Sequence, residues 1–415
     1  MNLFRYNRHW EKSYRYPYKK HRKFFKQLIN TLNTRQIVEI SGLRRTGKTT
    51  LLFQVLNYLI DNNYNSFSLW YFTFDEEKVK LEELLNTFAK QTHIDFKKDK
   101  IFVFLDEIQK LLDFQNQLKI YYDLYPNIKF FISGSTSLFI RKKTQESLAG
   151  RVKSLFIKPL DFKEYLFFND NLDILDNPLL FKDEIEKHFE IFLNNQFIDS
   201  LTLPDLNSKR EYYVGIMRKI IFEDIPSIFS VNNPQVLWQM IRIIAQQPGI
   251  FIDYQNLAND IGLSNKTISN YLYYLEESFI VKKVYNFSRN LITSEKKLKR
   301  YYLASPSFSW ALTDFADVGR LVENLVISLK SYQFFWRDPN RHEIDFVEIK
   351  NDNSIIPIEI KYKEKIQTRE FKNLIFFLKK FGCRKAIVFK KGVDEKSILY
   401  DADEIEIIEK PIFTL

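Results

Sequence analysis

The chain has 415 residues, of which 45% are hydrophobic and 16% aromatic, and its formal net charge is +10. This length predicts about two to four domains. No apolar run is as long as a membrane span requires, which excludes a spanning helix, and the N-terminus lacks the apolar core of a signal peptide. Cys383 is the single cysteine, which excludes an internal disulfide and a multi-cysteine metal site. We therefore expect a cytoplasmic protein without membrane contact, whose positive charge favours a polyanionic partner such as nucleic acid.

Residues 1–34 interleave basic and aromatic side chains, among them Arg8, Trp10, Tyr18 and Arg22. Such an arm can stack on nucleic-acid bases or on an adenine ring. Alternatively, it forms a short helix that packs beside a sheet and leaves its charges in water. The helical spacing of apolar residues over 24–32 favours the second interpretation slightly.

A glycine-rich loop follows the short apolar strand predicted over 37–40. It matches the phosphate-binding pattern G-x-x-x-x-G-K-[ST], and apolar residues at helical spacing follow it. The predicted ATP-binding residues are Gly42, Leu43, Arg44, Arg45, Thr46, Gly47, Lys48, Thr49 and Thr50. A strand that enters a helix through such a turn aims backbone N–H groups and a positive helix end at one anion site. Lys48 is expected to reach the β- and γ-phosphates, and the Thr49 hydroxyl to hold Mg²⁺.

Two acids end the third predicted strand. A second strand is predicted over 66–74, and the apolar run 101–105 is typical of a strand buried on both faces of a parallel sheet. Asp106 and Glu107 follow that run, at the carboxyl edge where ligands of such sheets bind. Asp106 is expected to hold Mg²⁺, and Glu107 to act as the general base for the attacking water.

Two further catalytic candidates follow. The strand predicted over 129–132 leads into a turn containing Ser135, whose hydroxyl either binds the attacking water or the γ-phosphate, or simply makes the turn. Arg151 precedes the apolar segment 152–157. It either reaches the γ-phosphate of a neighbouring subunit, which implies a homo-oligomer, or forms a surface salt bridge.

These motifs stand in a familiar order: the phosphate loop, Leu105-Asp106-Glu107, the Ser-Gly-Ser turn, then 148–151 and 159–164. The order resembles a large prokaryotic family of AAA-type ATPases that carry a C-terminal domain of unknown function (DUF4143-type). The resemblance covers nearly the whole chain, and it implies a five-stranded sheet of the additional-strand type with ATP as the nucleotide. In this loop, 43–46 departs from the family's usual residues but spares the phosphate-contacting positions.

The middle of the chain predicts helices. A helical lid is expected over 166–231, where the segment 220–225 resembles the family's joining helix. From 234 onward, three helical patterns and two strand patterns predict a winged helix, because Ala258, Gly262 and Ile268 have the spacing of a helix-turn-helix.

Contact of the winged helix with DNA and contact with a protein partner both stay open. The third helix offers few polar readers of DNA: Asn265, Lys266, Thr267 and Asn270. Support for DNA comes from a basic two-stranded wing, predicted over 279–284 and 298–303, and from Lys296, Lys297, Lys299 and Arg300.

The last hundred residues hold a second candidate site. Strands are predicted over 342–349 and 355–362 with a turn between them, which places Asp345 beside Glu359 and puts Lys361 on the same face. Together with Glu323 on the preceding helix, these groups form a possible metal and nuclease site. The D…E-x-K pattern resembles the restriction-endonuclease-like (PD-(D/E)xK) fold, to which the family's C-terminal domain is similar. An ordinary charged strand face is the alternative.

The sequence thus predicts an α/β P-loop NTPase fold of AAA type, followed by a helical lid, a winged helix and a small α/β nuclease-like domain. The expected boundaries are 1–165, 166–231, 232–290 and 291–415. We expect a Mg²⁺-dependent ATPase that acts on or with DNA. The alternatives are a slow ATP-dependent switch that engages a protein partner, and an ATP-gated metal-dependent nuclease.

Overall fold

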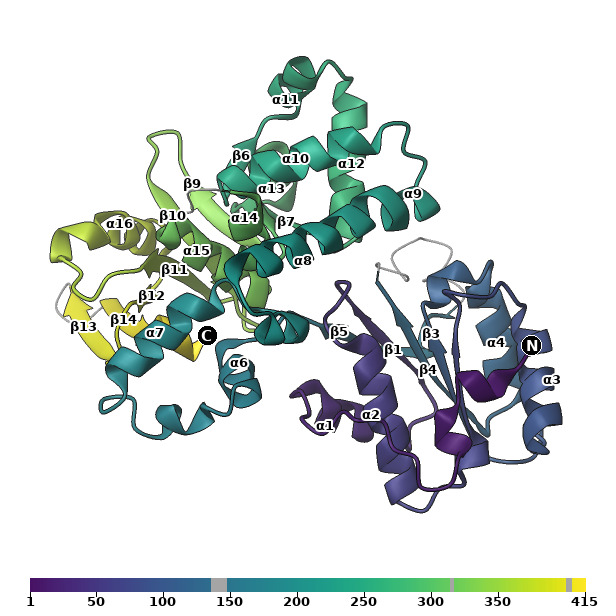
Figure 1. The fold of residues 1–415 in the computed structure, drawn as a ribbon. Helices are drawn as coiled ribbons and strands as arrows, with labels where there is room; N and C mark the ends of the chain where they lie inside the picture. Colours follow the sequence, from purple (N-terminus) through teal and green to yellow (C-terminus); the bar gives the residue numbers. More distant parts are fainter. Residues whose placement is uncertain (136–147, 314–316, 401–404) are drawn as a thin grey trace. The chain divides into compact units, whose positions relative to one another are not determined.

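The computed structural model describes residues 1–135, 148–313, 317–400 and 405–415 (Figure 1). The chain divides into two compact units, Met1–Lys158 and Pro159–Leu415, and each is described by itself. Within the described ranges, no helix is both long enough and apolar enough to cross a membrane.

The first unit is built on a parallel sheet of five strands in the order β2-β3-β4-β1-β5. The strands are β1 (Ile37–Gly42), β2 (Leu69–Thr73), β3 (Ile101–Asp106), β4 (Ile128–Gly134) and β5 (Val152–Ile157). Strand β4 lies between β1 and β3, which confirms the expected five-stranded sheet with an additional strand. The side chains of β3 are buried along its whole length, as its apolar run predicts.

Helices cover both faces of this sheet, as a parallel sheet requires (Figure 1). They are α1 (Phe24–Ile29), α2 (Lys48–Asp61), α3 (Leu81–Thr92) and α4 (Phe114–Leu124), with 3₁₀ turns at Leu3–Arg5, Arg8–Trp10, Ser66–Ser68 and Ile108–Lys110. Helices α1 and α2 lie on one side of the strands, and α3 and α4 lie on the other. The carboxyl ends of β1, β3 and β4 therefore meet at one open edge.

The N-terminal segment packs against the edge strand β2. Asn7 donates from Nδ2 to the Tyr71 carbonyl oxygen at 3.0 Å and accepts from the Tyr71 N–H at 2.7 Å, so it pairs with the strand as a neighbouring strand would. Trp10 is buried, and its Nε1 donates to the Leu69 carbonyl oxygen at 3.1 Å. Of the two interpretations of this arm, packing beside the sheet is the one that the structure shows. The expectation that the arm leaves its charges in water is wrong for Arg22, which is buried.

A buried carboxyl in β1 makes the stability of this unit depend on pH. Glu39 lies beside Ser154 of β5, whose hydroxyl donates to it, and burial raises the pKa of Glu39 to about 7 against the opposing effect of that hydrogen bond. Because the folded pKa exceeds the ordinary value of 4.5, the stability that the protonated carboxyl contributes is present below about pH 4.5. It is lost as the pH rises through about 7.

We expect Glu39→Gln to be more stable than the wild type by about 1–3 kcal/mol at pH 8, with a smaller difference at pH 5. Urea unfolding of both proteins at the two pH values measures this. Glu82→Gln, at an exposed position of α3, is the control. A difference between Glu39→Gln and the wild type that does not change with pH would contradict the assignment.

The second unit begins with helices. They are α6 (Phe162–Phe168), α7 (Lys182–Phe192), α8 (Leu206–Lys219) and α9 (Ile225–Ile228), with 3₁₀ segments at Leu172–Asp176 and Ile198–Thr202. A π-helical turn at Ile220–Asp224 joins α8 to α9. The helical content expected over 166–231 is confirmed, whereas its role as a lid stays a prediction.

Three helices and three short strands follow. They are α10 (Pro234–Gln246), β6 (Ile250–Ile252), α11 (Tyr254–Ile261), α12 (Asn265–Glu277), β7 (Val281–Asn286) and β8 (Lys299–Leu303), with α13 (Leu291–Lys296) between the last two strands. Gly262 ends α11 in the left-handed region at φ +76°, and the Ser264 side chain caps α12. The buried Ala258 and Ile268 lie on facing helices of this turn.

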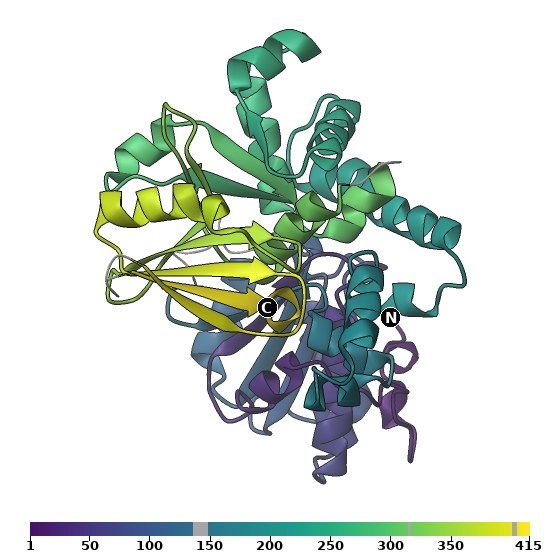
Figure 2. The same ribbon diagram turned by 90° about the vertical axis from the view of Figure 1, so that its left-hand side faces the viewer.

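The remaining elements complete a mixed sheet of nine strands, in the order β13-β14-β12-β11-β10-β9-β7-β8-β6. They are α14 (Pro306–Leu312), α15 (Val318–Leu329), β9 (Phe334–Arg337), β10 (Glu343–Ile349), β11 (Ile355–Lys361), α16 (Lys372–Phe381), β12 (Lys385–Lys390), β13 (Lys396–Tyr400) and β14 (Ile405–Pro411), with 3₁₀ turns at Thr368–Phe371 and Ile412–Thr414. Helix α16 lies along the C-terminal strands (Figure 2). Strands β7 and β9 pair in parallel, so the sheet continues across the boundary expected at 290.

Candidate functional site

Two glycines shape the loop between β1 and α2. Gly42 has φ +149°, and a Cβ at that position would lie 2.4 Å from the Ile157 carbonyl oxygen. Gly47 has φ +89° and stands at the N-cap of α2, where it offers no side chain to the first N–H groups of the helix. Only glycine fits the first position, and the second favours it strongly. The loop therefore brings its backbone close to the positive end of α2, as an anion site requires.

Lys48 is held over this loop. Its Nζ donates to the carbonyl oxygens of Gly42 at 3.1 Å and Leu43 at 2.9 Å, and its side chain is buried. The Thr46 hydroxyl also donates to the Leu43 carbonyl oxygen, at 2.8 Å. The other predicted ATP-binding residues range from buried Leu43, through half-buried Arg44, Thr49 and Thr50, to exposed Arg45. The ammonium group of Lys48 thus lies against the backbone of the loop, next to the start of α2.

The Asp106 carboxylate at the end of β3 meets the start of α2. The Thr49 hydroxyl donates to Asp106 Oδ2 at 2.6 Å, and the Tyr71 hydroxyl donates to the same oxygen at 3.1 Å. The Ser133 hydroxyl donates to Asp106 Oδ1. Hydroxyl and carboxylate oxygens are the ligands that Mg²⁺ prefers, so Thr49 and Asp106 fit the metal predicted for them. Sequence reasoning missed the roles of Tyr71 and Ser133, although Ser133 lies one residue before the end of β4, the strand beside β3.

Glu107 lies next to Asp106 in a left-handed conformation, φ +51°, that is uncommon for a residue other than glycine. Gln109 Nε2 donates to the Glu107 carboxylate, and the same nitrogen lies 3.3 Å from Ser135 Oγ. Burial raises the pKa of Glu107, the positive charge of Lys48 opposes that shift, and the charge of Asp106 adds to it. The structure thus places Ser135 beside Glu107, with Gln109, which sequence reasoning missed, between them.

Arg151 is paired within its own unit. Its Nε lies 2.9 Å from Asp123 Oδ1 and its Nη2 lies 3.1 Å from Asp123 Oδ2, a forked ion pair at a partly exposed position. This arrangement corresponds to the surface salt bridge that the sequence left open. Contact between Arg151 and a neighbouring subunit stays a prediction.

The predicted carboxylates of the second site come together in the second unit. Strands β10 and β11 pair with Phe346 opposite Ile358, which sets Asp345 beside Glu359. Lys361 Nζ lies 3.1 Å from Glu359 Oε2. Burial raises the pKa of Glu359 to about 8; the charge of Asp345 adds to this shift, and Lys361 opposes it.

An arginine lies among these carboxylates. Arg300 of β8 is buried, and its Nη1 lies 2.9 Å from Glu323 Oε1 and 3.9 Å from Asp345 Oδ1. Its Nη2 donates to Glu343. The Tyr302 hydroxyl also donates to Glu323, and burial together with the charge of Asp345 raises the pKa of Glu323 to about 7.

The expectation that Arg300 supports DNA contact is wrong, because its guanidinium points inward to these acids. Among the described residues, no group of three His, Cys, Asp or Glu side chains has a geometry that could hold a metal ion. Two cations lie against the acids of this cluster: Arg300 contacts Glu323, Glu343 and Asp345, and Lys361 pairs with Glu359. Sequence reasoning missed Arg300, Tyr302 and Glu343 as members. The second metal site stays a prediction without support from this arrangement.

We expect Arg300→Met to lower the free energy of unfolding by about 3–5 kcal/mol, because it leaves buried carboxylates without their cation. Guanidinium chloride unfolding measures the change. Lys385→Met, which removes an exposed ion pair with Glu406, should cost about 1 kcal/mol or less. Equal stability of the two variants would show that Arg300 does not balance the cluster.

The four predicted DNA readers lie at the start of α12. Asn265, Lys266 and Asn270 are exposed, although Asn265 Nδ2 donates to Gln255 Oε1 at 2.7 Å, and Thr267 takes part in the helix cap with Ser264. In the wing, Lys283 is paired with Glu276 at 2.9 Å. Three of the four predicted readers thus present polar side chains at the start of α12, and DNA contact there stays a prediction.

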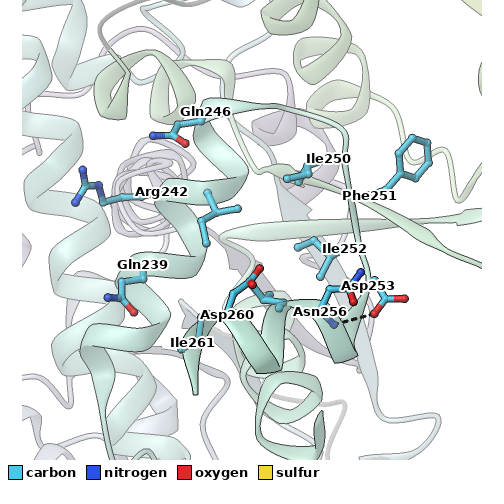
Figure 3. Close-up of a pocket in the computed structure, with 12 residues that line it drawn as sticks. Gln239, Arg242, Gln246, Ile250, Phe251, Ile252, Asp253, Asn256, Asp260 and Ile261 are labelled. Atoms are coloured by element: carbon cyan, nitrogen blue, oxygen red, sulfur yellow. Dashed lines mark hydrogen bonds between the residues drawn. The ribbon is translucent and has the colours of Figure 1, made fainter. Parts of the chain in front are cut away.

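A hollow of about 610 Å³ lies between α10, β6 and α11, apart from the predicted DNA readers (Figure 3). Arg242 and Gln246 border it on one side, and Asp253 and Asp260 border it on the other. The Asp253 side chain accepts from the Asn256 N–H at 3.0 Å, so it serves as the cap of α11. The lining carries charges of both signs and does not indicate one class of ligand.

Comparison with known protein families finds matches along most of the chain. Residues 34–166 match the family described as AAA domain. Residues 200–318 match a domain of unknown function, DUF8612, and residues 318–409 match another, DUF4143, which agrees with the resemblance drawn from the sequence. The first unit therefore has an α/β P-loop NTPase fold, and it is similar to an AAA domain over the matched residues.

Relatives match over most of the chain. An uncharacterized protein of Methanocaldococcus jannaschii is 26% identical over 354 residues, 81% of this chain and 77% of the relative. An uncharacterized protein of Haemophilus influenzae is 25% identical over 400 residues, 93% of this chain and 96% of the relative.

Solved structures were also compared. The Aeropyrum pernix ORC1 protein in complex with DNA has a TM-score of 0.33 at 14% identity, over 75% of this chain and 97% of that one. AMPPCP-bound DnaA from Aquifex aeolicus has a TM-score of 0.30 at 14% identity, over 61% of this chain and 86% of that one.

Proposed function

We propose that the chain is a Mg²⁺-dependent ATPase of AAA type. The observation that carries this proposal is the 2.6 Å hydrogen bond from the Thr49 hydroxyl to Asp106, which joins the start of the loop helix to the acidic end of β3. The match of residues 34–166 to an AAA domain adds support. A glycine turn, a buried lysine, a hydroxyl and two acids together suit a triphosphate with its metal.

Each group has a distinct role in the proposed site. Lys48 and the backbone of the loop hold the phosphates, and Thr49 and Asp106 hold Mg²⁺, which when bound neutralises phosphate charge. Tyr71 and Ser133 fix the orientation of Asp106 through their hydrogen bonds. Glu107 accepts a proton from the attacking water, while Gln109 and Ser135 orient its carboxylate. Arg151 is proposed to act across subunits of a homo-oligomer.

We further propose that the ATPase core of 1–165 is followed in the chain by a lid over 166–231, a winged helix over 232–290 and a nuclease-like domain over 291–415. The succession of α10, β6, α11, α12, β7 and β8, in which β8 pairs with both other strands, supports the winged helix. The proximity of Asp345 and Glu359 supports the nuclease-like fold.

DNA is the proposed partner, since the chain is strongly basic. A slow switch that engages a protein is the second candidate. It is supported by the pairing of Lys283 with Glu276 and of Arg300 with Glu323, which withdraws two cations from the predicted basic wing. The ATP-gated nuclease is the third candidate. It requires plasmid cleavage that Asp345→Ala removes, and cleavage that persists in this variant would exclude the site.

The test is the rate of ATP hydrolysis by the full chain without DNA and with single-stranded, duplex and branched DNA at several salt concentrations. Stimulation that falls steeply as salt rises supports action on DNA. Hydrolysis at one rate under all conditions supports the protein-partner switch. Absence of both ATP binding and hydrolysis would overturn the ATPase assignment itself.

A further inference from the structure

A buried arginine connects the phosphate loop to the end of β5. Arg22 precedes α1, its side chain is almost fully buried, and its Nη1 donates to the Thr46 carbonyl oxygen at 3.0 Å and to the Lys158 carbonyl oxygen at 2.8 Å. A guanidinium nitrogen of this kind carries two N–H groups, so one atom can serve both acceptors. One charged side chain thus joins two segments that are more than a hundred residues apart.

Both segments have a special place in the chain. Thr46 belongs to the loop proposed to hold the phosphates, and Lys158 is the last residue of the first unit, followed by Pro159 of the second. Proline has no N–H and cannot continue a strand ladder, so β5 ends here. We call 157–159 the connector.

A second contact joins the loop to the connector. Gly42 packs so closely on Ile157 that a Cβ would lie 2.4 Å from its carbonyl oxygen. The first and fifth residues of the loop are therefore both fastened to the end of β5, Gly42 by direct packing and Thr46 through Arg22. A movement of the loop backbone cannot leave the connector unaffected unless one of these contacts breaks.

Loss of Arg22 would affect both the loop at Thr46 and the connector at Lys158. Two carbonyl oxygens would lose a charge-assisted donor, that of Thr46 in a buried position and that of Lys158 in a partly buried one, and such bonds are among the stronger ones in proteins. The loop can bind a triphosphate well only if its backbone is already held in place. A side chain that fixes Thr46 therefore contributes to nucleotide affinity without touching the nucleotide.

We propose that Arg22 is a positioning residue which fixes the phosphate loop and transmits its nucleotide-bound shape to the connector between the two units. This inference rests on the proposed ATPase function. It assigns to the N-terminal segment a part in coupling nucleotide binding to the second unit.

The test compares the full-length wild type with Arg22→Met. Titration with a fluorescent ATP analogue measures affinity, and hydrogen–deuterium exchange measures protection of the connector with and without ATP. We expect ATP to slow exchange at Ile157 and Lys158 in the wild type. Arg22→Met should bind ATP about tenfold more weakly and show no ATP-dependent protection of the connector, even at saturating ATP.

Arg15→Met is the matched control, because Arg15 lies in the same segment but forms an exposed ion pair with Asp61. It should behave as the wild type does. Should Arg22→Met fail to fold, Arg22→Gln retains a donor but is too short to reach both carbonyl oxygens, and the same losses are expected of it.

Three outcomes separate the possibilities. Wild-type affinity in a folded Arg22 variant would overturn the positioning role. Weakened affinity with full protection of the connector at saturating ATP would overturn the coupling. If the wild type itself fails to bind ATP, the proposed function fails, and the coupling fails with it for a different and recognisable reason.

Discussion

Lys48→Ala is expected to weaken ATP binding by about 100-fold or more. The ammonium of Lys48 is held over the loop by the carbonyl oxygens of Gly42 and Leu43, where it can meet phosphate oxygens with little rearrangement. Its removal takes away charge-assisted hydrogen bonds in a buried place, where water cannot replace them. Isothermal titration with ATP and Mg²⁺ measures the loss.

Lys110→Ala is the control for that experiment. Like Glu107, Lys110 lies just after the end of β3, but its side chain is exposed and pairs with Asp75. Its removal should leave ATP affinity within about twofold of the wild type. If Lys48→Ala bound ATP as well as Lys110→Ala does, the loop would not be the nucleotide site.

Glu107→Gln is expected to lower kcat by about 10²- to 10⁴-fold, the usual contribution of a general base, while ATP remains bound. The amide has the shape of the carboxylate but cannot accept the proton of the attacking water. Single-turnover hydrolysis and retention of ATP on a filter measure the two effects separately. Normal turnover in this variant would refute Glu107 as the base.

The same variant gives a test through pH. Glu107 must be ionised to act as a base, and burial raises its pKa despite the opposing charge of Lys48. Activity should therefore rise with pH through a value above that of an ordinary carboxyl group, and fall as the pH drops below it. In Glu107→Gln, the residual activity should lack this acid limb. An unchanged limb would assign it to another group.

The local patterns of the first unit could be predicted because short-range chemistry decides them. A buried strand followed by two glycines, a lysine and a threonine requires few contacts from elsewhere to form the turn at the start of α2. The run before Asp106 is buried on both faces and can only be an interior strand. Parallel strands then bring the ends of β1 and β3 to one edge, as the sequence led us to expect.

Side-chain partners across the fold could not be predicted in the same way. Nothing in the sequence distinguishes Arg300, which neutralises buried acids, from the nearby lysines, for which the pattern predicts a basic surface. The hydrogen bonds from Tyr71 to Asp106 and from Arg22 to the Thr46 carbonyl oxygen likewise form only when segments distant in the chain come together. The strand pairing of β7 with β9, which carries one sheet across the expected boundary at 290, is also a contact between separate elements.

The sequence by itself determined that residues 37–49 form a strand, a glycine-rich turn and the start of a helix, and that a buried strand ends in Asp106 and Glu107. Spacing and backbone sterics settle such features within a few residues. Only the tertiary structure decided which side chains hold these groups in place and where the charge of the C-terminal cluster is balanced. Those outcomes depend on burial and on hydrogen bonds between residues far apart in the chain, and a linear pattern does not record them.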